Sequence, residues 1–164
     1  MLAQHPQRIL IVEDEASTAA DLGRRLELAG YRVAGIATDE AGAMTAIHRH
    51  EPDLVLIDMH LKGAHDGIHL ANRVRRRHDI PVVFVAARVD CETLERARIT
   101  EPFGYLVQPF SSVLFRPTIE MALWKHAMAK RIKASEGLFP AISQPAVEHT
   151  STLRRLQRAR SAGR

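Results

Sequence analysis

The segment DLVLID, residues 53–58, decides the fold class. Four apolar residues follow Asp53, and a second acidic residue, Asp58, ends the run. A strand that is apolar on both faces is typical of the centre of a parallel sheet, where helices cover both sides. We therefore predict a central parallel strand at residues 53–57, with a carboxylate at its carboxyl end.

Similar short apolar runs occur before and after this segment, and patterns typical of helices separate them. The predicted strands are 8–12, 31–37, 53–57, 81–85 and 104–107. The predicted helices are 16–29, 39–50, 66–77, 90–99, with Asp90 as a cap, and a last helix that ends near Lys133. Strict alternation predicts an α/β fold with a parallel sheet, helices on both faces and right-handed crossovers.

One residue conflicts with the last helix. Pro117 lies where this helix should already be formed. Proline is tolerated only in the first turn, because it lacks an N–H and collides with the preceding turn. Either the helix begins late, near Arg116, or its first turn is distorted.

Acidic residues gather where the predicted strands end. Glu13 and Asp14 follow the first strand, and Asp58 follows the third. Ligands of parallel sheets bind beyond the carboxyl ends of the strands, so these side chains converge if the two strands are neighbours. Mutual repulsion and oxygen donors favour Mg²⁺, which commonly accompanies phosphoryl transfer. Asp58 is the candidate phosphoryl acceptor.

Length and composition limit the class of protein. The chain has 164 residues, enough for one domain and a modest extension. Cys91 is the single cysteine, so an internal disulfide is impossible and a reducing compartment fits. The longest apolar run, residues 80–87, is too short to cross a bilayer, and the start lacks a signal-peptide pattern. We expect a cytoplasmic protein without membrane contact.

The positive charge lies at one end of the chain. Residues 1–120 hold 14 Lys and Arg against 17 Asp and Glu, whereas residues 121–164 hold 9 against 2. The net charge of +4 therefore comes from a basic C-terminal extension. Residues 1–120 give no electrostatic sign of nucleic-acid binding, so we do not expect nucleic acid as the main partner.

Five motifs carry a resemblance to a known family. RILIVEDE, PDLVLIDMHLKG, DGIHLA, IPVVFVAARVD and PFGYLVQPF resemble the receiver domain of two-component response regulators, over about residues 7 to 125. The resemblance implies a flavodoxin-like (βα)5 fold with strand order 2-1-3-4-5. We expect a receiver domain at residues 1–125, followed by a helical extension and a flexible basic tail at residues 126–164.

The resemblance also implies roles for single residues. Asp58 would accept a phosphoryl group from a histidine kinase or a histidine phosphotransfer protein. Asp14 would contact Mg²⁺ directly, Glu13 mainly through water, Asp58 through a carboxylate oxygen and His60 through its backbone carbonyl. Tyr105 matches the aromatic residue that changes rotamer on activation. Such a domain is a signalling protein that acts through protein contacts, not an enzyme.

Two positions depart from the family pattern. Ala86 stands where a hydroxyl residue is expected, and Gln108 stands where a lysine is expected. Glutamine keeps N–H donors but has no charge. It cannot make the charge-assisted hydrogen bond that a lysine would make, and we expect this to cost about 1–2 kcal/mol in the phosphorylated state. We expect Asp58 to be phosphorylated with weak coupling to Tyr105. The resemblance also makes Gln108–Pro109 a candidate cis peptide bond.

Other functions stay open beside this one. The chain fits a phosphorylation-independent scaffold, because Ala86 and Gln108 remove two switch groups. The basic tail fits binding to nucleic acid or to an acidic partner. The face made by the fourth helix, fifth strand and fifth helix fits a homodimer contact, with Phe103, Tyr105 and Phe115 as candidates. A haloacid-dehalogenase-type enzyme is set aside, because it needs a second Asp at position 60.

Three histidines form a further candidate site. His65 and His69 are four residues apart, and His60 is close in sequence. This spacing suits a transition metal. The family resemblance places the same residues on a solvated loop and helix face, so the sequence leaves both readings open.

Overall fold

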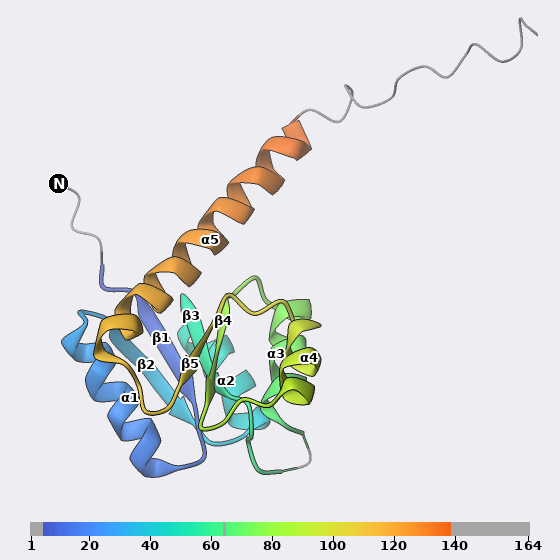
Figure 1. Cartoon of the computed structure of the whole chain (residues 1–164). Helices are drawn as coiled ribbons and strands as arrows, with labels where there is room; N and C mark the ends of the chain where they lie inside the picture. The colour runs from blue at the N-terminus through green and yellow to red at the C-terminus, as the bar shows by residue number, and fades with distance from the viewer. Residues whose placement is uncertain (1–4, 64, 139–164) are drawn as a thin grey trace, which may run out of the picture. The chain divides into compact units, whose positions relative to one another are not determined.

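A computed structural model describes residues 5–63 and 65–138. Five parallel strands form one sheet in the order β2-β1-β3-β4-β5, and five helices alternate with them (Figure 1). The predicted flavodoxin-like α/β fold is confirmed. The strands are β1 (Arg8–Val12), β2 (Arg32–Ala37), β3 (Leu54–Asp58), β4 (Val82–Ala86) and β5 (Gly104–Val107). The helices are α1 (Ala16–Leu28), α2 (Glu40–His50), α3 (Gly67–Arg77), α4 (Cys91–Arg98) and α5 (Ser112–Leu138).

The sheet separates two hydrophobic clusters. Side chains of a strand alternate between its faces, so Ile9 and Ile11 of β1 pack with α1 and α5, whereas Leu10 and Val12 pack with α2, α3 and α4. Figure 1 shows α1 on one side of the sheet and α3 and α4 on the other. β4 is buried along its whole length, as expected of a strand covered on both faces.

Aspartate side chains fix the starts of three helices. Asp39 accepts a hydrogen bond from the Gly42 amide, and Asp90 accepts one from the Thr93 amide. Asp66 caps α3 in the same way. The prediction that Asp90 caps its helix is confirmed. Asp39 and Asp66 are also N-caps and not helical residues, so the predicted helix starts at 39 and 66 were each one residue too early.

The sequence left two possibilities for the last helix, a late start near Arg116 or a distorted first turn, and the structure excludes the late start. α5 starts at Ser112, so a start near Arg116 is wrong, and Pro117 is a residue of the helix interior. Packing explains this start, because Phe115 and Ile119 are buried against the sheet and hold the chain helical on both sides of the proline.

α5 is described as far as Leu138, which makes the predicted end near Lys133 wrong. The chain divides into two compact units between Ala129 and Lys130. The predicted domain boundary at residue 125 stays a prediction. The expected flexible basic tail lies mostly outside the described residues.

The register of the sheet brings the strand ends to one edge. Val12 at the end of β1 is paired with Ile57 of β3, so Glu13 and Asp58 follow side by side. On the other side, Ala86 at the end of β4 is paired with Val107 of β5. The predicted convergence of the strand-end residues follows from this register.

Candidate functional site

Three carboxylates meet at the carboxyl edge of the sheet. Glu13, Asp14 and Asp58 each present an oxygen, and the three oxygens lie within 4.8 Å of one another. Glu13 and Asp14 follow β1, and Asp58 is the last residue of β3. The sequence prediction that these acids converge is confirmed.

Glu13 is the most buried of the three, with 4% of its surface exposed. Its amide donates to the Ala37 carbonyl at 2.9 Å, and its Oε1 accepts a hydrogen bond from the Glu15 amide at 2.9 Å. Burial raises the pKa of Glu13 to about 7. The Glu15 amide opposes this rise, and the charges of Asp58 and Asp14 add to it. Glu13 therefore keeps a proton to a much higher pH than an exposed glutamate does.

Asp58 sits between β3 and the first turn of α3. Burial is the main cause that raises the pKa of Asp58 above its usual value, and the Asp14 and Glu15 charges act in the same direction. The His60 amide, which donates to Oδ1 at 3.1 Å, opposes the rise.

The start of α3 lies directly on the backbone of Asp58. A Cβ placed on Gly67 would lie 1.8 Å from the Asp58 carbonyl oxygen. Glycine at position 67 is therefore a requirement of close packing between the helix and the site.

The donor set fits a hard dication. Two carboxyl groups in the cluster have raised pKa values because burial and mutual repulsion disfavour their charges. An ion with oxygen ligands, such as Mg²⁺, offsets both effects. Such an ion would supply a positive charge to an anionic group brought to the pocket.

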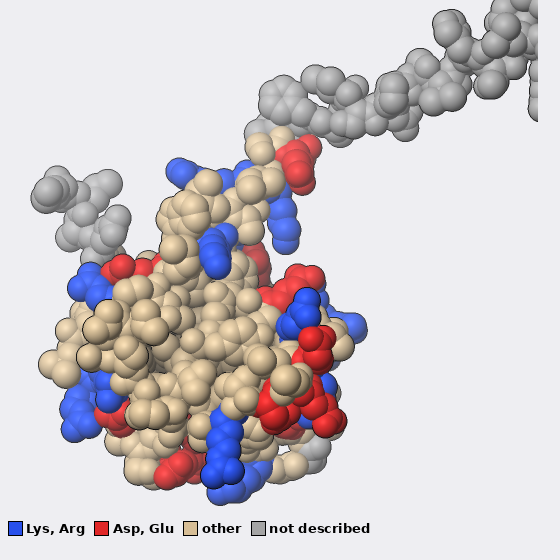
Figure 2. All heavy atoms as spheres, viewed as in Figure 1, with Lys and Arg blue, Asp and Glu red and all other residues tan. Residues whose placement is uncertain are grey.

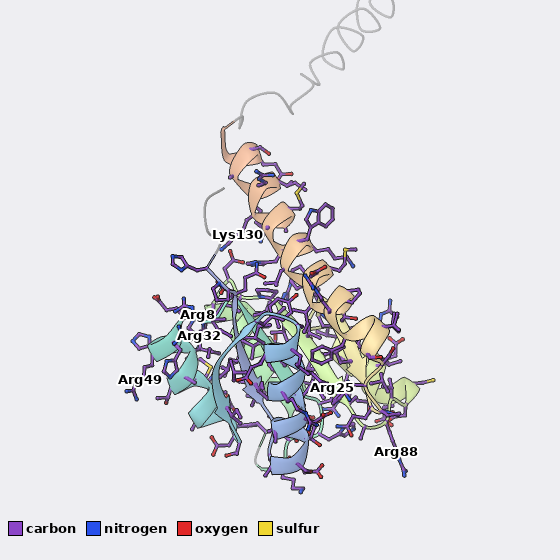
Figure 3. The ribbon with its side chains drawn as sticks, turned by 90° about the vertical axis from the view of Figure 1, so that its left-hand side faces the viewer. Arg8, Arg25, Arg32, Arg49, Arg88 and Lys130 are labelled. Atoms are coloured by element: carbon purple, nitrogen blue, oxygen red, sulfur yellow. The ribbon has the colours of Figure 1, made fainter. Side chains whose placement is uncertain are left out.

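An open pocket surrounds the carboxylates and contains two cations that sequence reasoning missed. Its lining residues are Glu13, Asp14, Glu15, Asp58, His60, Lys62, Ala87, Arg88 and Gln108. The Lys62 amide lies 3.4 Å from Asp14 Oδ2, and its Nζ lies 3.8 Å from the same oxygen. Arg88 is exposed, and Figure 3 shows it extending away from the body of the domain. Both residues lie within four positions of a strand end, which is the signal that could have identified them.

Gln108 is a lining residue of the pocket, whereas Ala86 is not. The Gln108–Pro109 peptide bond is cis, as the resemblance implied. Ala86 is 1% exposed and packs in the cluster on the α3 face. The position expected to supply a hydroxyl therefore offers the pocket no donor.

Tyr105 is not a lining residue of the pocket. Its half-buried ring stacks with Phe84 at 5.9 Å between ring centroids, and burial raises its pKa. Phe115, a candidate for a dimer contact, is 4% exposed and belongs to the core, so this candidate is wrong. Phe103 packs against the same cluster.

The comparisons with known proteins point in one direction. Residues 9–120 match the family model described as "Response regulator receiver domain". The chain is 35% identical over 139 residues to the transcriptional regulatory protein PdtaR of Mycobacterium tuberculosis. This alignment covers 85% of the chain and 66% of PdtaR, so the chain spans about two thirds of that relative. It is also 37% identical over 106 residues to the transcriptional activator protein IrlR of Burkholderia pseudomallei, covering 65% of the chain and 45% of IrlR.

A solved structure gives the same result. The signal receiver domain of a modulated diguanylate cyclase from Desulfovibrio desulfuricans G20 superposes with a TM-score of 0.72 and 35% identity. The match covers 76% of the chain and 99% of that structure.

No helix among the residues that the structure describes has the length and apolar character needed to cross a membrane.

Proposed function

Because this chain belongs to the response regulator receiver domain family of two-component systems, we propose that it accepts a phosphoryl group on Asp58 with the aid of Mg²⁺. The observation that carries the proposal is the meeting of three carboxylate oxygens within 4.8 Å at the carboxyl edge of the sheet. Relatives that are named as response regulators are signalling proteins, and we propose the same class for this chain.

The transfer uses one oxygen of Asp58 as the nucleophile. This oxygen attacks the phosphorus of a phosphohistidine on a histidine kinase or phosphotransfer protein. A P–O bond to Asp58 forms, the P–N bond breaks, and the imidazole leaves with its electron pair and takes up a proton. The His60 amide, 3.1 Å from Oδ1, holds the carboxylate in place during this exchange.

Glu13, Asp14 and Asp58 are the proposed side-chain ligands of the ion, and the His60 carbonyl is the proposed backbone ligand. The charge of Mg²⁺ would favour the ionised form of Asp58, whose pKa is otherwise raised by burial. Gln108 keeps a donor beside the phosphoryl group but supplies no charge. Lys62 and Arg88 are the lining cations available to replace that charge.

Signalling would then proceed through the surface of the domain. Figure 2 shows uncharged residues across the middle of the face where β5 and the start of α5 lie in Figure 1. Exposed apolar residues of these elements are Val107, Val113, Leu114, Met121 and Trp124. They support the proposed contact with a second copy or with a downstream protein. Light scattering, which measures the molar mass in solution, tests whether two copies associate with and without phosphorylation.

The experiment that tests phosphorylation is intact mass measurement after incubation with acetyl phosphate and Mg²⁺. We expect one added phosphoryl group that hydroxylamine removes and that Asp58→Asn lacks. No adduct in a chain that binds Mg²⁺ would contradict the proposal. It would favour the second candidate, a scaffold read without phosphorylation, which the absence of a hydroxyl at Ala86 and of a cation at Gln108 supports.

A further inference from the structure

We propose that Glu40, His65 and His69 form a binding site for a transition-metal ion of the Zn²⁺ type, separate from the carboxylate pocket. Each of the three residues presents one ligand atom, and these atoms lie within 4.8 Å of one another. None of the three is a lining residue of the pocket that contains Asp58. The site is independent of phosphorylation and would exist in a scaffold as well.

The fold places the three residues at the starts of two neighbouring helices. Glu40 is the first residue of α2, directly after its cap Asp39. His65 and His69 stand on either side of Asp66, whose side chain accepts a hydrogen bond from the His69 amide at 3.0 Å. Because both helix starts are fixed by caps, the backbone keeps the three residues close together before any ion binds, while the exposed imidazole rings can still turn.

The side chains already contact one another. The His65 and His69 rings are stacked, with centroids 4.0 Å apart. His69 Nδ1 lies 3.5 Å from Glu40 Oε2. The Glu40 side chain is 13% exposed, whereas that of His69 is 46% exposed and His65 is also exposed. The carboxylate is therefore the fixed ligand, and the two imidazoles are free to turn towards an ion.

The donor set selects the kind of ion. Two imidazole nitrogens and one carboxylate oxygen suit Zn²⁺, Ni²⁺ or Cu²⁺, whereas Mg²⁺ prefers oxygen ligands. Ligand atoms around a tetrahedral Zn²⁺ are roughly 3.3 Å apart. Rotation of the exposed rings would bring the ligand atoms, which now lie within 4.8 Å of one another, towards this separation. The fourth position would be left to water or to a partner's side chain.

Arg73 competes with the ion for Glu40. Its guanidinium pairs with Glu40 Oε1, one helical turn beyond His69. Burial raises the pKa of Glu40, but the hydrogen bond and charge of Arg73 outweigh this and hold it below its usual value. The carboxylate is thus ionised without an ion, and its second oxygen, Oε2, faces His69. Removal of the Arg73 charge is expected to strengthen metal binding.

The test is calorimetric titration of Zn²⁺ into the full chain with Mg²⁺ in excess, so that the carboxylate pocket is occupied. We expect one saturable site whose affinity falls at least tenfold in His65→Ala and in His69→Ala. His48→Ala removes an exposed histidine of α2 outside the cluster and serves as the matched control, with no change expected. Arg73→Gln should bind Zn²⁺ more tightly than the natural chain.

Three results would overturn the proposal. The first is that Zn²⁺ shows no saturable binding under excess Mg²⁺. The second is that His65→Ala and His69→Ala both bind Zn²⁺ with the affinity of the natural chain. The third is that His48→Ala loses as much Zn²⁺ affinity as they do. Circular dichroism of each variant confirms that the fold is kept. All three histidine substitutions lie at exposed positions, so a loss of binding is separable from unfolding.

Discussion

The main-chain amide of Gln108 donates a hydrogen bond to the carbonyl oxygen of Ala86 at 2.9 Å. The two positions that depart from the receiver pattern are therefore neighbours, joined through the backbone of β4 and β5. Neither side chain takes part in this bond. The sheet edge keeps its shape while it lacks both the hydroxyl and the cation expected there.

Gln108→Lys should make phosphorylation faster. An ammonium group in the pocket turns a neutral contact with the phosphoryl group into a charge-assisted one, worth about 1–2 kcal/mol. This corresponds to about a tenfold faster adduct formation with acetyl phosphate, measured by intact mass over time. Gln108→Met is the control of similar length without charge. An equal gain in that variant would show that charge is not the cause.

Arg88→Ala should slow phosphorylation by an anionic donor. Arg88 lines the pocket without a hydrogen bond or ion pair among the described residues, so its charge is available to the donor. Exposed charges contribute up to about 1 kcal/mol, so we expect up to about a fivefold loss that shrinks at high salt. Arg49→Ala removes an exposed arginine from the end of α2, well apart from Arg88 in Figure 3, and should have no effect.

The metal-free protein should lose stability as the pH rises towards neutral. The pKa of Glu13 is 4.5 when unfolded and about 7 in the fold. Its contribution to stability is complete below about 4.5, is lost as the pH rises through about 7, and is constant above that. Thermal unfolding in a chelator across this range measures the slope. Glu13→Gln should flatten it, and an unchanged slope in that variant would contradict the assignment.

Gly67→Ala should destabilise the domain by about 3 kcal/mol, because the new Cβ collides with the Asp58 carbonyl oxygen. Denaturant unfolding measures this change. Gly23→Ala is the matched control, because its new Cβ would lie 4.0 Å from the nearest side chains. This substitution should stabilise the helix by about 0.5–1 kcal/mol, because alanine has the higher helix propensity. A mild effect of Gly67→Ala would mean that α3 is free to move away from the site.

Pro117→Ala should stabilise the domain. Proline in a helix interior costs about 3 kcal/mol, of which about 1 kcal/mol is offset because it restricts the unfolded chain. We expect a gain of about 2 kcal/mol in denaturant unfolding. Met121→Ala, an exposed substitution on the same helix, should change little. A loss of stability in Pro117→Ala would show that the helix depends on the proline.

The sheet and the carboxylate cluster were predictable from sequence because both follow from periodicity. Runs of apolar residues indicated the strands, and the acids at the ends of β1 and β3 had to meet once those strands paired. The starts of α2 and α3 were predicted one residue too early, because an Asp cap and a helical Asp look alike in sequence. The start of α5 depended on tertiary packing of Phe115 and Ile119, which local propensity does not contain.

The surroundings of the carboxylates were less predictable. Lys62 and Arg88 reach the pocket from loops, whose paths have no periodic signal. Glu40 joins His69 through the packing of α2 beside α3, a contact between residues far apart in sequence. Sequence spacing indicated His65 and His69 but offered His60 as the third member. In the structure the third member is Glu40, whereas His60 lines the carboxylate pocket.

The raised pKa of Glu13 has a consequence for the charge of the pocket when a metal ion binds. A dication that entered near neutral pH would displace a proton from some of the molecules, so the local charge would rise by less than two units on average. Metal binding in this pocket would therefore be coupled to proton release. In weakly buffered solution, metal uptake would acidify the medium, and the heat of binding would depend on the ionisation enthalpy of the chosen buffer.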